Sequence, residues 1–142
     1  MVIKLFPHSS ETYQQMVSLR HEILRKPLGL SFTLEELAKD QHDLLVGAFE
    51  YNTLMGCAIL TQIDHNYLKI RQMLVNQSVQ GKGVGKSILI FAENYAKENG
   101  YSHLFMNARI SAIGFYGKSG YHVVGGPFEE VGIRHYRMEK VL

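Results

Sequence analysis

The spacing of hydrophobic and polar residues divides the chain into short strands and helices. Alternating or β-branched segments predict strands at residues 2–6, 44–50, 54–62, 67–76, 103–108, 121–124 and 134–141. Apolar residues at helical spacing, with capping residues before them, predict helices at residues 10–25, 33–39, 86–99 and 112–118. Gly125-Gly126-Pro127 is expected to end the strand at 121–124, because glycine and proline interrupt regular structure.

The order of these segments predicts one α/β domain over residues 1–142. One strand and two helices come first, three strands follow as a meander, and strands then alternate with helices. The helix at 86–99 joins the two strands that flank it, so these strands are expected to be parallel. The sequence therefore predicts a mixed, mostly antiparallel, twisted sheet of six to seven strands, flanked by about four helices.

Composition excludes several classes of protein. Hydrophobic residues make up 46% of the chain and charged residues 20%, which is ordinary for a globular protein. The net charge of +2 is too small to indicate a nucleic-acid partner, and no apolar run approaches the roughly 20 residues of a membrane helix. Cys57 is the single cysteine, so no intrachain disulfide can form, and a reducing, cytoplasmic setting is expected.

Residues 79–87, with the sequence VQGKGVGKS, resemble a loop that holds a phosphate. A nucleotide-triphosphate loop would end as Gly85-Lys86-Ser87 does, but its first glycine would fall on Gln80. A dinucleotide fingerprint would match Gly81 and Gly83, but its third glycine would fall on Lys86. Each of these two patterns therefore mismatches the sequence at one of its required glycines.

A third pattern, [Q/R]-x-x-G-x-[G/A], matches Gln80-Gly81-Lys82-Gly83-Val84-Gly85 at every fixed position. Here the sequence resembles the GCN5-related N-acetyltransferase (GNAT) family, whose pyrophosphate loop has this form. Asn107-Ala108, followed by the segment AIGFYGKSGY at 112–121, resembles the second motif of that family, and FEEVGIRH at 128–135 is similar to a bacterial subgroup of small acetyltransferases. The resemblance implies a GNAT fold with a splayed pair of parallel strands, acetyl-CoA as cosubstrate and no metal.

The physical chemistry of the loop agrees with this resemblance. Glycines let backbone N–H groups converge on a phosphate, and a helix that starts near Gly83 directs the positive end of its dipole there. Lys82 and Lys86 add positive charge. The resemblance also implies that further residues contact the coenzyme, with the pantetheine arm along the first three: Met73, Leu74, Val75, Asn107, Ala112, Phe115, Tyr116 and Lys118.

Acetyl transfer to an amine requires an acid, an oxyanion donor and a base. The resemblance implies that Tyr116 is the acid. A phenol with a pKa of about 10 keeps its proton at neutral pH, and a thiolate with a pKa of about 8.5 can accept this proton with help from position; the alternative is a tyrosine that only packs in the core. The backbone amide of Val75 is the candidate donor to the thioester oxygen. The base has several candidates, of which His42 stands near the expected acceptor pocket: His42, Glu22, Gln72, Glu129 and His135.

The sequence thus predicts direct acetyl transfer from acetyl-CoA to a primary amine of a small molecule or peptide. The alternative is a non-catalytic CoA-binding or regulatory domain of the same fold. Cys57 lies in mid-strand without an adjacent base, so we expect a buried hydrophobe and no acyl-enzyme. The basic segment 20–43 suits an anionic amine or is a solvated helix face, and a homodimer is possible from the resemblance.

Overall fold

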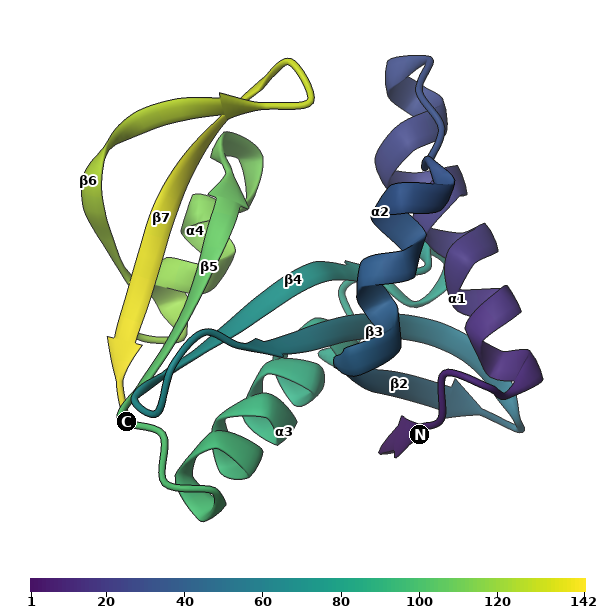
Figure 1. The fold of residues 1–142 in the computed structure, drawn as a ribbon, viewed down its shortest axis with the longest axis horizontal. Coiled ribbons are helices and arrows are strands. Elements are labelled where there is room, and N and C mark those ends of the chain that lie inside the picture. Colours follow the sequence, from purple (N-terminus) through teal and green to yellow (C-terminus); the bar gives the residue numbers. More distant parts are fainter.

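The computed structural model describes all residues from 1 to 142, which form one seven-stranded sheet flanked by four α-helices (Figure 1). The strands lie in the order β1-β2-β3-β4-β5-β7-β6. Their bounds are β1 Val2–Phe6, β2 Leu44–Glu50, β3 Thr53–Gln62, β4 Tyr67–Val75, β5 His103–Arg109, β6 His122–Glu130 and β7 Ile133–Val141. The helices are α1 Glu11–Arg20, α2 Leu34–Ala38, α3 Val84–Glu98 and α4 Ile113–Lys118.

The predicted elements are confirmed, with most ends within two residues of the prediction. The helix expected through Arg25 ends its α-helical part at Arg20 and continues as a π-helical turn over His21–Arg25. The α2 helix begins with the capping box that its sequence indicates, in which Thr33 and Glu36 each bond to the other's backbone. None of the helices is both long and apolar enough to span a bilayer.

The prediction that Gly125-Gly126-Pro127 ends a strand is wrong. Strand β6 continues through these residues to Glu130, and its register against β7 shifts between Val124 and Phe128. Because β6 is the last strand of the sheet, the N–H group that Pro127 lacks would have had no partner strand on its outer side. Proline and a bulge are both tolerated at such an edge.

Strands β4 and β5 are parallel, as predicted, and they separate after a short paired region. The pairing joins Tyr67–Lys69 to His103–Phe105, whereas every other strand pair in the sheet is antiparallel. Beyond this region β4 bends at Gln72, whose φ is 52°, and the register against β3 shifts between Cys57 and Ile59. The expected bulge and splayed pair are therefore present, and Figure 1 shows the two strands diverging from a common end.

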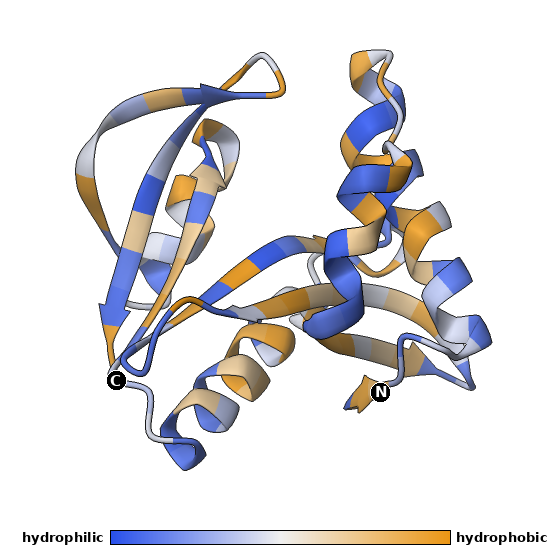
Figure 2. Ribbon diagram, in the orientation of Figure 1, coloured by the Kyte–Doolittle hydropathy of each residue, from blue (hydrophilic) through white to orange (hydrophobic).

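The bulge also changes which face of the sheet each β4 side chain occupies. Leu68 and Ile70 lie in the larger core, which is formed with α3, while Leu74 lies in the smaller core, formed with α1. Strict alternation would place all three on one face. Figure 2 shows hydrophobic residues along α3 and the central strands that it covers.

A buried ionic network fixes α1 and the turn after α2 to the sheet. Asp40, which has no exposed surface, accepts bonds from Tyr13 at 2.6 Å, Arg20 at 2.7 Å and Arg71 of β4 at 2.8 Å. Arg71 also bonds to Asp43 at 2.7 Å. A carboxylate at this position is needed because removing one member leaves buried charge without compensation.

We predict that Asp40→Asn lowers the free energy of unfolding by about 3–5 kcal/mol, since Arg20 and Arg71 then lose a buried counter-charge. Urea unfolding at pH 7 measures this loss. The matched control is Glu22→Gln, which removes an exposed ion pair with Lys26 and should cost less than about 1 kcal/mol. Equal losses in the two variants would contradict the role of the network.

The same network predicts an acid dependence. Burial alone would raise the pKa of Asp40, but the bonds from Tyr13, Arg20 and Arg71 lower this pKa below its ordinary value. The stabilisation is therefore fully present above the unfolded-state pKa of about 3.9 and is lost as the pH falls through the lower folded-state pKa. The stability difference between the wild type and Asp40→Asn should shrink below about pH 4.

Candidate active site

A cleft of about 250 Å³ opens where β4 and β5 diverge. Its floor is formed by residues 69–73 of β4 and 106–109 of β5. Leu24 and Arg25 close it from the end of the first helix, and Glu130, Val131 and His135 close it from the β6–β7 hairpin. The strand divergence, the end of the first helix and the hairpin therefore contribute residues to one site. Figure 1 shows the backbone of β4 and β5 diverging, with the β6–β7 hairpin beside β5.

Tyr116 of α4 lines this cleft. Its side chain is 7% exposed, and its hydroxyl makes no hydrogen bond to protein although it is not fully enclosed. Burial raises the pKa of Tyr116 to about 12, so the phenol keeps its proton at neutral pH. The neighbouring Tyr121 differs, because its hydroxyl donates to Glu93 at 2.9 Å away from the cleft.

His135 of β7 enters the cleft from the opposite wall and is 4% exposed. Its Nδ1 lies 2.8 Å from the carbonyl oxygen of Ile133, which can only accept, so Nδ1 carries the hydrogen in the neutral ring. Nε2 is then free to accept a proton. Glu130 lies 3.8 Å from Nε2 and also accepts a bond from Asn107 at 3.1 Å.

The glycine loop lies at the start of α3. Gly81 and Gly83 both have a φ of 79°, and a Cβ placed on either would meet nothing within 4 Å. Gly83 caps the 15-residue helix without a side-chain bond, so the first N–H groups of α3 are left for another partner. Gln80 donates at 3.3 Å to the carbonyl of Val75, which ties the loop to the end of β4.

Gly85 joins this loop to the cleft. A Cβ at Gly85 would lie 3.1 Å from the ring of Phe115 and 3.6 Å from the terminal methyl of Met73. Met73 lines the cleft, and Phe115 packs edge-on against Tyr116 with ring centroids 5.2 Å apart. The loop, the start of α4 and the cleft are therefore contiguous.

The structure brings together part of the predicted site. Six of the predicted residues line the cleft: Gln72, Met73, Asn107, Ala112, Tyr116 and His135. Nine lie in the loop before α3, in its first turn or on α4, outside the cleft: Gln80, Gly81, Lys82, Gly83, Val84, Gly85, Lys86, Phe115 and Lys118. The side chain of Leu74 packs in the core beneath α1, and Val75 ends β4 next to Asn76, whose N–H donates to the carbonyl of Met55.

Three candidate bases are not brought into the cleft. His42 is exposed on the turn before β2, Glu22 pairs with Lys26 at 3.4 Å, and Glu129 is exposed on β6. His135 differs from these three residues because it is buried and lines the cleft.

Sequence reasoning missed three of the four basic side chains of the cleft, Lys69, Arg71 and Arg109; the fourth, Arg25, belongs to the basic segment 20–43. One signal was present in the pattern: Lys69 and Arg71 alternate with the apolar Leu68 and Ile70, so both had to lie on the face opposite α3. Their contacts with residues about 30 positions away, such as Asp40, were not visible in the sequence.

Cys57 is fully buried in β3, as expected, and burial raises the pKa of its thiol to about 12. A nucleophilic cysteine needs an accessible thiolate, and Cys57 provides none. The structure gathers no group of three or more histidine, cysteine, aspartate or glutamate side chains that could hold a metal ion.

Comparison with known proteins identifies the family. The family model described as "Acetyltransferase (GNAT) domain" matches residues 10–142. The chain belongs to the GNAT acetyltransferase family. An acetyltransferase of Bacillus subtilis (strain 168) is 31% identical over 107 residues, which cover 71% of this chain and 72% of that protein. "Probable N-acetyltransferase 14" of Xenopus tropicalis is 31% identical over 91 residues, or 61% of this chain, and the match spans only 44% of that relative.

Solved structures share the GNAT fold. An N-acetyltransferase from Lactobacillus plantarum superposes with a TM-score of 0.85 at 24% identity, covering 100% of this chain and 99% of that one. A GNAT family acetyltransferase from Elizabethkingia anophelis, with acetyl-CoA bound, has a TM-score of 0.76 at 18% identity, covering 99% and 97% of the two chains. The fold predicted from the sequence is therefore confirmed.

Proposed function

We propose that this GNAT protein transfers the acetyl group of acetyl-CoA directly to a primary amine. The observation that carries the proposal is the unpartnered Tyr116 hydroxyl, which faces a cleft contiguous with an uncapped, glycine-rich helix start. The acetyl-CoA bound to the Elizabethkingia anophelis protein, which has the same fold, supports acetyl-CoA as the cosubstrate of this chain.

The loop residues fit the pyrophosphate of the coenzyme. The open space over Gly81 and Gly83 lets a phosphate approach the backbone, and the free N–H groups of α3 would donate to it. Lys82 and Lys86 are exposed beside these groups and contribute positive charge. Met73, Asn107, Ala112 and Phe115 would contact the pantetheine arm between the loop and the cleft, with Lys118 nearby on α4.

In the cleft and at the adjoining end of β4, three groups of this chain would serve the transfer. Acetyl-CoA supplies the activated acetyl group as a thioester. The Val75 amide would donate to the thioester oxygen as negative charge develops there. Tyr116 would give its proton to the departing thiolate, and Nε2 of His135 would take a proton from the ammonium or the attacking amine.

We predict that Tyr116→Phe lowers kcat by about 10²–10⁴-fold, because a positioned general acid contributes that much, with little change in the Kd of acetyl-CoA. Release of CoA in the presence of an amine panel measures kcat, and calorimetry measures Kd. The matched control is Tyr121→Phe, which removes an equally buried phenol whose hydroxyl bonds to Glu93, and which should cost stability but not kcat.

Two outcomes of this experiment would reject the proposal. Unchanged turnover in Tyr116→Phe would remove the acid from the mechanism. Tight acetyl-CoA binding by the wild type without transfer to any amine would favour the alternative, a non-catalytic CoA-binding or regulatory domain.

We predict that His135→Gln lowers kcat/KM for an amine by about 10²-fold. The loss should decrease as the pH approaches the pKa of the amine, about 10.4, because more neutral amine is then present without a base. His103→Gln is the control, since His103 bonds to Ser102 and stacks on Tyr67 outside the cleft. A loss that stays constant with pH, or an equal loss in both variants, would argue against His135 as the base.

We predict that Gly83→Ala weakens acetyl-CoA binding by about tenfold or more, because a methyl group then occupies the space from which a phosphate reaches the N–H groups. Gly100→Ala is a close control: Gly100 also adjoins the end of a helix, has a φ of 81° and has nothing within 4 Å of its Cβ position. Both variants should lose about 1 kcal/mol of stability from the left-handed backbone. Equal Kd values of acetyl-CoA for Gly83→Ala and Gly100→Ala would show that the phosphates do not bind at this loop.

A further inference from the structure

The cleft carries more positive charge than its own carboxylates neutralise. Four basic side chains line it, Arg25, Lys69, Arg71 and Arg109, but only one carboxylate, Glu130. Two of the four are paired with carboxylates that do not line the cleft. Arg25 pairs with Glu36 at 2.6 Å, and Arg71 pairs with both Asp40 and Asp43.

Lys69 and Arg109 have no carboxylate partner within 4 Å. Arg109 donates to the carbonyl oxygen of Leu24 at 3.0 Å, so it is at least held in place by the end of the first helix. Lys69 makes neither a hydrogen bond nor an ion pair, although it is half-buried. Burial lowers the pKa of Lys69; nearby Glu130 opposes this lowering, while Arg71 and Arg137 add to it. An anion beside Lys69 would relieve this unfavourable environment.

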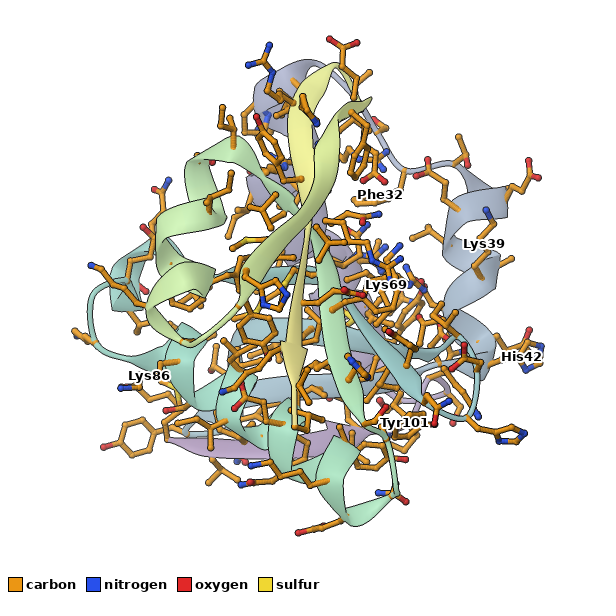
Figure 3. All side chains as sticks on the ribbon, turned by 90° about the vertical axis from the view of Figure 1, so that its left-hand side faces the viewer. Phe32, Lys39, His42, Lys69, Lys86 and Tyr101 are labelled. Atoms are coloured by element: carbon orange, nitrogen blue, oxygen red, sulfur yellow. The ribbon has the colours of Figure 1, made fainter.

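A second cavity, of about 400 Å³, continues from the first and is lined by no hydrophobic residue. Lys69, Arg71 and Gln72 belong to the walls of both cavities. On its far side stands Lys39, which is exposed after α2 and has no ion pair. Figure 3 shows Lys69 among the side chains between the sheet and the α2 region that carries Lys39, while Lys86 lies on the opposite side.

The two cavities share Lys69 and Arg71, but they differ in the other groups that each offers to an acceptor. At the first, Glu130 and His135 offer a carboxylate and a proton acceptor, which suit an ammonium that must lose its proton. The second is also lined by two carboxylates, Glu36 and Asp43, but these already pair with Arg25 and Arg71. Lys39 and Lys69 are left there with unpaired positive charge, which suits an anion. A diamine would place its second ammonium beside these lysines, where like charges repel.

We propose that the acceptor is a small primary amine that also carries an anionic group, a carboxylate or a phosphate, held by Lys69 and Lys39 in the second cavity. This inference rests on the proposed function and specifies the substrate class of the same site. The amine end lies in the first cavity beside His135, and the anionic end lies between the turn after α2 and β4.

The experiment compares acceptors of matched length. 5-Aminopentanoate and 4-aminobutylphosphonate carry the two kinds of anion, 1-aminopentane carries none, and 1,5-diaminopentane carries a second cation. At least one of the two anionic acceptors should have a kcat/KM about tenfold or more above those of 1-aminopentane and 1,5-diaminopentane. This advantage should shrink as salt is added. The better of the two anions distinguishes carboxylate from phosphate recognition.

Substitutions of the two lysines test whether they bind the anionic group of the acceptor. Lys69→Gln should raise KM for the preferred anionic acceptor by about ten- to hundredfold with little change in kcat, and should change kcat/KM for 1-aminopentane by no more than about twofold. Lys39→Gln, at an exposed position, should act in the same direction by a smaller factor. Lys97→Gln, an exposed lysine in the last turn of α3, is the matched control and should match the wild type.

A binding measurement makes the result independent of turnover. Calorimetry of the anionic acceptor with the CoA-saturated protein should give the same ratio between the wild type and Lys69→Gln as the KM values. Equal use of 1-aminopentane and the anionic amines, or a Lys69→Gln variant that matches Lys97→Gln, would overturn this inference and leave the transferase intact. Absence of transfer to every amine despite acetyl-CoA binding would overturn the proposed function, and this inference with it.

Discussion

The divergence of β4 and β5 is the constraint on which the other features of the site depend. Two adjacent parallel strands normally continue to pair, since unpaired backbone groups inside a protein are costly. Here the pairing ends after Lys69 and Phe105, and the left-handed residue Gln72 turns β4 away. The opened space is what allows side chains from α4, β5 and the β6–β7 hairpin to reach one cleft.

Something must hold the two strands apart, and the structure shows two restraints. Strand β5 is paired along its whole length with β7, from His103 to Arg109. Strand β4 is held on its outer face by Arg71, whose guanidinium reaches both Asp40 and Asp43. Arg109 adds a link from β5 to the carbonyl of Leu24. The ionic network is therefore part of the site as well as of the fold, because it sets the position of the β4 segment that lines the cleft.

Local patterns in the sequence were sufficient for the elements but not for the side-chain environment. Periodicity and capping placed the helices and most strands, because these signals come from residues close in the chain. They failed at Pro127, whose tolerance depends on β6 being an edge strand. Simple alternation along β4 also does not give the face of Leu74, because the bulge reverses it. They also could not distinguish His42 from His135. Both are histidines near predicted strands, and only the tertiary structure, in which β7 lies between β5 and β6, buries His135 at the cleft.

The bulge at Gln72 also divides the two sides of the reaction. Before it, Lys69 and Arg71 point to the face of α1 and α2; after it, Met73 packs toward α3 and lies near Gly85. One strand thus presents charged groups to one face and an apolar, loop-adjacent surface to the other within five residues. In the proposed reaction, a phosphate-bearing cosubstrate at the α3 side and a charged acceptor at the α2 side would meet where the strand turns. The buried Oε1 of Gln72, which has no hydrogen-bond partner, lies at that turn. A buried polar group without a partner is costly, and this cost falls on the residue at which β4 turns away from β5.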